Sequence, residues 1–358
     1  MREGFRAAAA GRDAPSPEPG LGLIGPGGLL SAPGRWFLLG VFLTALLFLF
    51  LPKKAYASWS PGFLSLSPWR FAQTVAEYSR SHPVFSDLGA SSPEAVDSFN
   101  LLAALDVFRG ERGVGSEARP RAGVTRAEMS ALLVRLLGEE AQAQVLAESG
   151  AWRRMSSVFR DGGELEELSW ARGPVARAWE LGLIQGRPDG RFAPREGVTL
   201  AEALTMVLRL LGREKEAREP VLGEIPPWPE GEMALGRSLG LLDWAGEDPS
   251  PGKALTREEV ALLLDRTLRV SRRDPASGEE RGPLLGDPRR YPLEAGLLRE
   301  ILPGGRVELE TGEGAKVRRL GTRVVVRGAG KLEGLLGRRV RLVSLSGQAE
   351  VVYVEPAR

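Results

Sequence analysis

A short pattern recurs three times in the middle of the chain, and it constrains the fold more than any other feature. In each copy a threonine is followed three residues later by a glutamate: Thr125/Glu128, Thr199/Glu202 and Thr256/Glu259. This spacing is that of a capping box, in which the threonine hydroxyl and the glutamate carboxylate satisfy backbone amides at the start of a helix. A proline also lies five residues before each threonine. The sequence therefore predicts three helices that begin in the same way.

The residues behind each capping box show which face of the predicted helix is buried. After the first box, apolar side chains follow at i, i+3, i+4, i+7 and i+8: Met129, Leu132, Leu133, Leu136 and Leu137. The second and third copies keep these offsets, with Thr267 as the one polar residue. This period places the apolar side chains on one stripe of an amphipathic helix. Because a short helix cannot bury such a stripe alone, we expect the three copies to pack against one another.

The segment before each capping box repeats as well, and it is most complete in the second copy. There a predicted helix near Trp170 is followed by Gly182, by Gly186 and by the pair Asp189-Gly190, which are residues typical of helix ends and tight turns. An aromatic-x-Asp triplet opens the first two copies, and each triplet begins 40 residues before its capping threonine. This equal spacing indicates a true internal repeat.

These motifs together resemble the S-layer homology domain. The resemblance rests on Phe-x-Asp, Gly-Leu-Ile-x-Gly-x-x-Asp-Gly-x-Phe-x-Pro and Val-Thr-Arg-Ala-Glu, and it extends over residues 84–138, 158–212 and 224–268. It implies an all-α, three-repeat bundle with pseudo-threefold symmetry. It also implies non-covalent, carbohydrate-binding attachment to a secondary cell-wall polysaccharide, in some cases one that carries pyruvate ketals.

The resemblance implies a set of carbohydrate-binding residues: Arg126, Arg257, Trp179, Gly186 and Asp189. The two arginines match the arginine of the family motif, and a guanidinium can donate two parallel hydrogen bonds to a sugar carboxylate. Trp179 is a candidate platform for a sugar ring, as are Trp170 and Trp244. The alternatives are solvated arginines at helix starts, a tryptophan in the core and an aspartate in a simple turn. Leu200 replaces the motif arginine in the second copy, so we expect its cleft to bind weakly.

The N-terminal region reads as an export leader over residues 1–57. Residues 36–51 are apolar and uncharged, and Ala55-Tyr56-Ala57 offers a small-x-small cleavage site before Ser58. The alternative is an uncleaved anchor, which would be the chain's contact with a membrane. Residues 58–83 are expected to form a linker or helical lead-in.

The character of the sequence changes after the third copy. Residues 269–292 are rich in Arg, Gly, Pro and Asp, as expected of a linker, and residues 293–358 contain short β-branched runs separated by glycine turns. They predict a small antiparallel β barrel or sandwich, so the fold class is α+β and multidomain. This segment carries more basic than acidic residues, which suits an anionic polymer, an acidic protein partner or an ordinary soluble domain. Tyr353 is its one aromatic residue after the linker, so a nucleic-acid partner is not expected.

Composition excludes several classes of chemistry. The chain has no cysteine and one histidine, His82, so disulfides, thiolate metal sites and cysteine nucleophiles are excluded. We expect no enzyme, no catalytic residues, no metal site and no cofactor. The leading hypothesis is an exported structural protein of the cell wall or S-layer, anchored through its tandem repeats. The alternative is an envelope scaffold whose β domain binds a protein partner and whose repeats no longer bind polymer.

Overall fold

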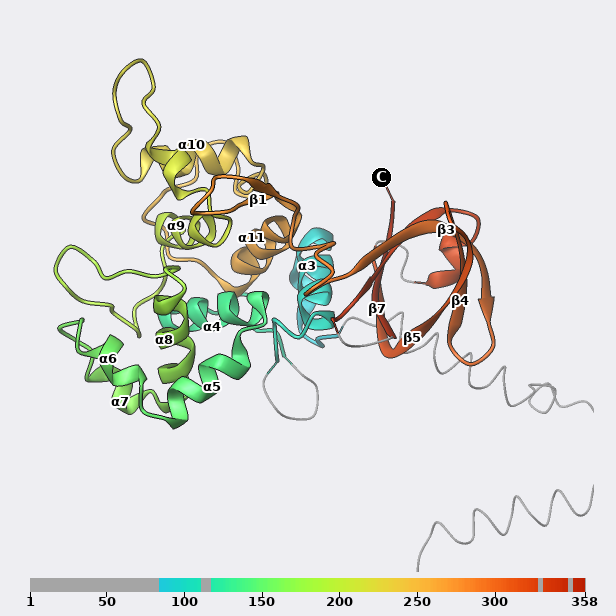
Figure 1. The fold of residues 1–358 in the computed structure, drawn as a ribbon, viewed down its shortest axis with the longest axis horizontal. Coiled ribbons are helices and arrows are strands. Elements are labelled where there is room, and N and C mark those ends of the chain that lie inside the picture. Colours follow the sequence, from blue (N-terminus) through green and yellow to red (C-terminus); the bar gives the residue numbers. More distant parts are fainter. Residues whose placement is uncertain (1–83, 111–116, 328–330, 347–349, 358) are drawn as a thin grey trace, which may run out of the picture. The chain divides into compact units, whose positions relative to one another are not determined.

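The computed structural model describes residues 84–110, 117–327, 331–346 and 350–357 (Figure 1). The predicted leader at 1–57 and the lead-in at 58–83 lie outside this range. In the described part of the chain, no helix has the length and apolar composition that a membrane crossing requires. The prediction of helices followed by a β domain is confirmed.

Short helices make up the first part of the described chain, in the following order: η2 (Leu88–Ala90), α3 (Pro93–Ala104), α4 (Arg126–Leu137), α5 (Glu140–Glu148), α6 (Trp152–Ser156), α7 (Glu164–Glu167), η3 (Ser169–Ala171), α8 (Arg172–Glu180), α9 (Leu200–Leu210), η4 (Glu214–Arg218), α10 (Glu230–Ser238) and α11 (Arg257–Arg269). The three predicted capping-box helices are α4, α9 and α11. Both halves of the box are formed at Thr125, Thr199 and Thr256.

The segments just before these three helices are joined in a closed ring of backbone hydrogen bonds. The Val198 amide donates to the Val124 carbonyl at 2.8 Å, the Leu255 amide to Val198 at 2.9 Å, and the Val124 amide to Leu255 at 3.0 Å. A second set of bonds runs around the copies in the opposite sense, since the amides of Arg126, Leu200 and Arg257 donate to the carbonyls of Glu196, Lys253 and Ala122. Each copy thus contacts both others through equivalent positions, which gives the helical part a pseudo-threefold arrangement.

The aromatic-x-Asp triplets have a clear structural role. Asp161 accepts hydrogen bonds from the amides of Phe192 and Ala193 at 2.8 and 2.6 Å, and Asp87 accepts equivalent bonds from Ala118 and Arg119. Ala193 and Arg119 both have positive φ, 57° and 54°. Each aspartate therefore holds a left-handed turn that leads into the capping box.

The core follows the predicted stripes. Met129, Leu133 and Leu136 of α4 are fully buried, as are Ala203 and Val207 of α9. They belong to one apolar cluster that extends through all three copies, so the expectation of mutual packing is confirmed.

The C-terminal part contains two sheets. Their strands are β1 (Arg272–Arg273), β2 (Glu280–Arg281), β3 (Leu293–Leu302), β4 (Arg306–Thr311), β5 (Gly314–Val326), β6 (Arg339–Ser344) and β7 (Glu350–Pro356), with η5 (Leu332–Leu335) before β6. β1 and β2 pair with each other within the predicted linker, and β3–β4–β5–β7–β6 close into a ring.

The expectation of wholly antiparallel pairing is wrong at one place, because β5 and β7 run parallel. The other pairings in the ring are antiparallel. A closed ring of five strands cannot alternate direction throughout, so at least one neighbouring pair must be parallel. The result is a closed five-stranded barrel with mixed strand directions.

A buried ion cluster joins the barrel to α11. Glu355 of β7 is almost fully buried and accepts from Arg269 of α11 at 2.9 and 3.1 Å and from Arg341 of β6 at 2.7 Å. Asp265 of α11, also buried, pairs with Arg269 at 2.9 Å and with Arg327 at 3.4 Å. Because the two carboxylates are shielded from water, each depends strongly on its arginine partners.

Candidate functional site

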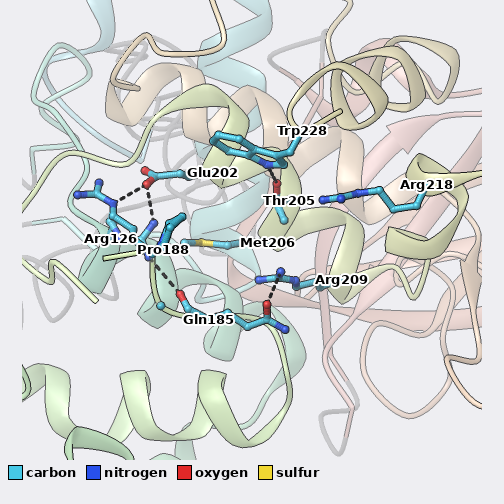
Figure 2. A pocket seen from close by; sticks show the side chains of 11 residues that line it. Arg126, Gln185, Pro188, Glu202, Thr205, Met206, Arg209, Arg218 and Trp228 are labelled. Atoms are coloured by element: carbon cyan, nitrogen blue, oxygen red, sulfur yellow. Dashed lines mark hydrogen bonds and ion pairs between the residues drawn. The ribbon is translucent and has the colours of Figure 1, made fainter. Parts of the chain in front are cut away.

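A cleft of about 280 Å³ lies where residues of the three copies meet (Figure 2). We call it the first cleft. Its lining comes from the start of α4, the loop after α8, α9, η4 and the segment before α10: Arg126, Gln185, Gly186, Arg187, Pro188, Glu202, Thr205, Met206, Arg209, Arg218 and Trp228. Four arginines and one glutamate line the cleft, and each arginine pairs with a carboxylate: Arg126 with Glu202, Arg187 with Glu196 and Glu202, Arg209 with Glu214, and Arg218 with Glu232.

Arg126 is bound to the protein through every part of its guanidinium. Nε donates to the Phe192 carbonyl at 2.6 Å, Nη2 to the Gln185 carbonyl at 3.4 Å, and Nη1 pairs with Glu202 Oε1 at 2.9 Å. The group also lies 5.2 Å from the centre of the Phe192 ring, and its side chain is 4% exposed. Burial lowers the pKa of Arg126, although the charge of Glu202 opposes this shift. Arg126 thus forms an internal ion pair with Glu202 in the wall of the cleft.

Glu202 connects the capping box of α9 to this ion pair. One carboxylate oxygen accepts from the Thr199 amide at 3.0 Å, and the other accepts from Arg126 and from Arg187 Nε at 3.0 Å. Burial would raise the pKa of Glu202, but the Thr199 amide and the two guanidinium charges outweigh it and hold the pKa below its usual value. The capping glutamate of the second copy therefore also anchors the arginine of the first.

The outer part of the cleft holds more accessible groups. Arg209 is held by Glu214 at 2.8 Å and by the side-chain carbonyl of Gln185 at 2.9 Å. Arg218 pairs with Glu232 at 2.8 Å and is 45% exposed. Trp228 donates from its indole nitrogen to Thr205 Oγ1 at 3.2 Å and is half exposed. Figure 2 shows the hydrogen bond from Trp228 to Thr205 and the one from Arg209 to Gln185.

The structure brings two of the predicted site residues together and places the others elsewhere. Arg126 and Gly186 both line the first cleft. Arg257 donates from Nε to the Ala118 carbonyl at 2.6 Å and lies 4.7 Å from the centre of the Phe108 ring, which repeats the environment of Arg126. Asp189 forms a surface turn, in which it accepts from the Arg191 amide and pairs with the Arg191 side chain. Trp179 lines a separate hollow on α6 and α8.

Gly186 is needed for a close contact. A Cβ atom there would lie 2.9 Å from a ring carbon of Phe159. The aromatic residue of the Phe-x-Asp triplet is therefore packed under the loop that forms the edge of the cleft, and any side chain at position 186 would displace it.

A second cleft, of about 450 Å³, is lined by residues around Leu200 and includes Trp244, Arg121, Lys253, Glu258 and Glu259. Leu200 is buried, as expected for an apolar residue. Lys253 pairs with Glu259 at 2.5 Å and is 56% exposed. Lys253 thus supplies the positive charge next to the capping glutamate Glu259, where the motif arginine is replaced by Leu200. Glu258 accepts from Ser91 at 3.0 Å and lies 3.6 Å from Arg121, so it belongs to this cleft.

Trp228, Arg209 and Arg218 were not identified from the sequence. Trp228 lies in the run Pro226-Pro227-Trp228-Pro229, just before the helix of the third copy, where the repeat pattern is weakest. The sequence feature that could have identified Trp228 is its position between Pro227 and Pro229, next to a predicted repeat. In the described residues, no group of three potential metal ligands comes together.

Comparison with known proteins supports the family resemblance. The S-layer homology domain family matches residues 167–204, which include Gly186 and Glu202 of the first cleft. The chain is 31% identical over 222 residues to a cell surface protein of Thermoanaerobacter kivui, an alignment that covers 61% of this chain and 25% of the relative. It is 28% identical over 207 residues to the middle cell wall protein of Brevibacillus brevis, with 58% and 17% covered.

A third relative is the cellulosome-anchoring protein of Acetivibrio thermocellus. The identity is 29% over 182 residues, and the alignment covers 48% of this chain and 35% of the relative. The chain thus spans about a third or less of the length of these curated relatives.

Proposed function

We propose that this chain is an exported cell-envelope protein that attaches non-covalently to an acidic wall polysaccharide through its helical part. The carrying observation is the first cleft, which four ion-paired guanidinium groups and one half-exposed tryptophan line, and to which the matched S-layer homology segment contributes the loop at Gln185–Pro188 and Glu202. The relatives named for the cell surface, the cell wall and cellulosome anchoring support the location.

We extend the family assignment from the matched segment to three units, at residues 84–138, 158–212 and 224–268. The closed ring of hydrogen bonds supports this extension, because Val124, Val198 and Leu255 make equivalent contacts in the three copies. The family match reaches the second unit, and the three capping boxes carry the same geometry into the others.

The ligand class follows from the chemistry of the lining. A sugar bearing a carboxylate, such as a pyruvate ketal of a secondary cell-wall polysaccharide, suits a planar guanidinium that donates two parallel hydrogen bonds. Among the arginines that line the first cleft, Arg218 is the most exposed, at 45%, and Arg187 follows at 22%. Trp228 offers an indole face to the apolar side of a sugar ring. Arg126 and Glu202 form the wall behind them and fix the loop at Gln185.

A binding experiment tests the proposal. The purified full chain is mixed with cell walls that retain their polysaccharide and with walls from which acid has removed it, and the bound fraction is measured by sedimentation. We expect binding to the first and not to the second. Trp228→Ala and Arg218→Gln are each expected to weaken binding about tenfold, which corresponds to ~1.4 kcal/mol.

Trp170→Ala is the matched control. Trp170 is 51% exposed, similar to Trp228, and it does not line the first cleft, so its loss should leave binding unchanged. Equal binding to both kinds of wall, or a Trp228→Ala variant that binds like the wild type, would contradict the proposal.

A second candidate function rests on Arg126. Because Glu202 and two carbonyls already occupy its guanidinium, the helical part could serve as a scaffold that binds no polymer while the barrel binds a protein partner. This candidate predicts no sedimentation with either kind of wall and a specific partner cross-linked to residues 293–358.

A further inference from the structure

The backbone of Trp228 is held next to α9, in the lining of the first cleft. Trp228 stands between Pro227 and Pro229, which restrict its backbone, and the helix α10 that follows packs on α9 and η4. This packing is close, because a Cβ atom at Gly231 would lie 2.0 Å from the carbonyl oxygen of Ala217. The backbone therefore fixes the place from which the side chain of Trp228 projects, but it does not fix the orientation of the half-exposed ring.

Thr205 supplies the contact that sets this orientation. Its side chain is buried, and its hydroxyl donates to the Ala201 carbonyl at 2.8 Å. Because that bond uses the hydroxyl proton, the oxygen keeps its lone pairs for a donor. The indole nitrogen of Trp228 donates to this oxygen at 3.2 Å (Figure 2). Since an indole has one N–H group and no acceptor, this bond favours a single orientation of the ring.

The helices equivalent to α9 carry no hydroxyl at this position. Four residues of α9 line the first cleft: Glu202, Thr205, Met206 and Arg209. The glutamate and the arginine recur at the same offsets in α4 and α11, but the position of Thr205 is taken by Ala131 in α4 and by Leu262 in α11. Neither of these side chains can accept a hydrogen bond. The hydroxyl is thus specific to the first cleft.

Trp170 is the counterpart of Trp228 in the second copy, and it lacks such a partner. It stands 12 residues before Gly182, as Trp228 stands 12 residues before Gly240. The two side chains are about equally exposed, at 51% and 50%. Trp170 belongs to η3, which packs on α4, and within the described residues its indole nitrogen donates to no other residue. The two tryptophans therefore differ in the hydrogen bond and not in exposure.

We propose that Thr205 is a positioning residue, which holds the indole of Trp228 in the orientation that receives a sugar ring of the wall polysaccharide. This inference rests on the proposed function for the identity of the ligand. An indole face packs on the apolar face of a sugar, and a ring that is already ordered loses less conformational freedom when the ligand binds. Among the described residues, the first cleft is the place where a tryptophan and a threonine hydroxyl of this kind meet.

The orientation of Trp228 is tested in the full chain without any ligand. Its indole proton is identified by NMR as the signal that disappears in Trp228→Ala, and that of Trp170 as the signal that disappears in Trp170→Ala. We expect the proton of Trp228 to exchange with water more slowly than that of Trp170. In Thr205→Val, which keeps the branched side chain but lacks the hydroxyl, the two rates should become similar. Thr205→Ser, which keeps the hydroxyl, should restore slow exchange.

Sedimentation with walls that retain their polysaccharide tests the consequence for binding. Thr205→Val should weaken binding about threefold, as expected when one side chain must be ordered by the ligand, and Thr205→Ser should recover most of this loss. In a Trp228→Ala background, Thr205→Val should cause no additional loss, because the hydroxyl acts through the indole.

Thr267→Val is the matched control. Thr267 is buried on α11, and its hydroxyl donates to the carbonyl four residues earlier, that of Leu263, at 2.7 Å, but it does not line the first cleft. Its replacement should change the unfolding temperature about as much as Thr205→Val does and should leave wall binding unchanged.

The proposal is overturned if Thr205→Val leaves the exchange of the Trp228 indole proton unchanged. It is also overturned if Thr205→Val binds walls like the wild type while Trp228→Ala binds weakly, or if the loss from Thr205→Val persists in the Trp228→Ala background. A wild type that does not bind walls, or a Trp228→Ala variant that binds as well as the wild type, contradicts the proposed function instead. The exchange rates then decide alone whether Thr205 fixes the indole.

Discussion

Replacing the capping glutamates at positions 202 and 259 with glutamine should have very different effects, although the two occupy the same position in their helices. Both accept a hydrogen bond from the amide of the capping threonine, at 3.0 Å from Thr199 and 2.9 Å from Thr256. Glutamine can keep that bond, since it also occurs in capping boxes. The substitution therefore removes the negative charge and little else. The cation opposite each glutamate decides the outcome.

The structure gives the two magnitudes. Glu202 faces Arg126, whose side chain is 4% exposed, so Glu202→Gln leaves a buried guanidinium without its counter-charge. Losing one partner of a buried pair costs ~3–5 kcal/mol, and the carbonyls that still accept from Arg126 reduce this to about 2–4 kcal/mol. Glu259 faces Lys253, which is 56% exposed and returns to water, so Glu259→Gln should cost about 0–1 kcal/mol.

Urea unfolding followed by tryptophan fluorescence checks this difference, with both variants and the wild type measured at low salt and at about 1 M NaCl. We expect Glu202→Gln to unfold at clearly lower urea with an unchanged slope, and its deficit to persist at high salt. Equal losses for the two variants, or a Glu202→Gln deficit that high salt removes, would refute the reasoning from burial.

Three further predictions concern pH, the cleft edge and the contact of Tyr291, in the linker before the barrel, with α4. Because the folded-state pKa of Glu202 is depressed, its contribution to stability is complete above its unfolded pKa of about 4.3 and is lost as the pH falls through the lower folded value; Glu202→Gln should flatten the loss of stability below about pH 4 in acid titrations followed by circular dichroism. Gly186→Ala should destabilise by about 1–3 kcal/mol in thermal unfolding, because Phe159 must move; an unchanged unfolding temperature would contradict the close contact. Tyr291→Phe should cost about 1–3 kcal/mol in urea, since the buried tyrosine hydroxyl donates to the Leu136 carbonyl at 2.9 Å and the carbonyl would lose its partner; wild-type stability would show that water replaces the bond.

The local signals in the sequence proved reliable for the helices. The Thr-x-x-Glu spacing located the starts of α4, α9 and α11, because a capping box is a local interaction whose residues are four apart at most. The apolar period likewise located the buried faces. In the barrel, glycine turns separated the strands, but the parallel pairing of β5 with β7 follows from closure of the ring, which no single segment encodes.

The site was harder to predict because its contacts are long-range. The motif arginine was identified at Arg126, but its partner Glu202 comes from the next copy, and only the ring of copies brings them together. Trp179 matched the expected residue type but lies on another surface, whereas Trp228 stands 12 residues before Gly240, the position that Trp170 takes before Gly182 in the second copy. Residue type and spacing therefore predicted the elements better than they predicted which side chains meet.

The cyclic hydrogen bonding of Val124, Val198 and Leu255 has a consequence for how this architecture can evolve. An open stack of repeats can gain or lose a unit at its end, because only one junction changes. A closed triad has no end: deleting one unit exposes two unsatisfied junctions, and inserting a fourth would force every junction to a new angle. Diversity must therefore accumulate in the clefts and connecting loops, as Leu200 and Lys253 illustrate, while the count of units stays at three.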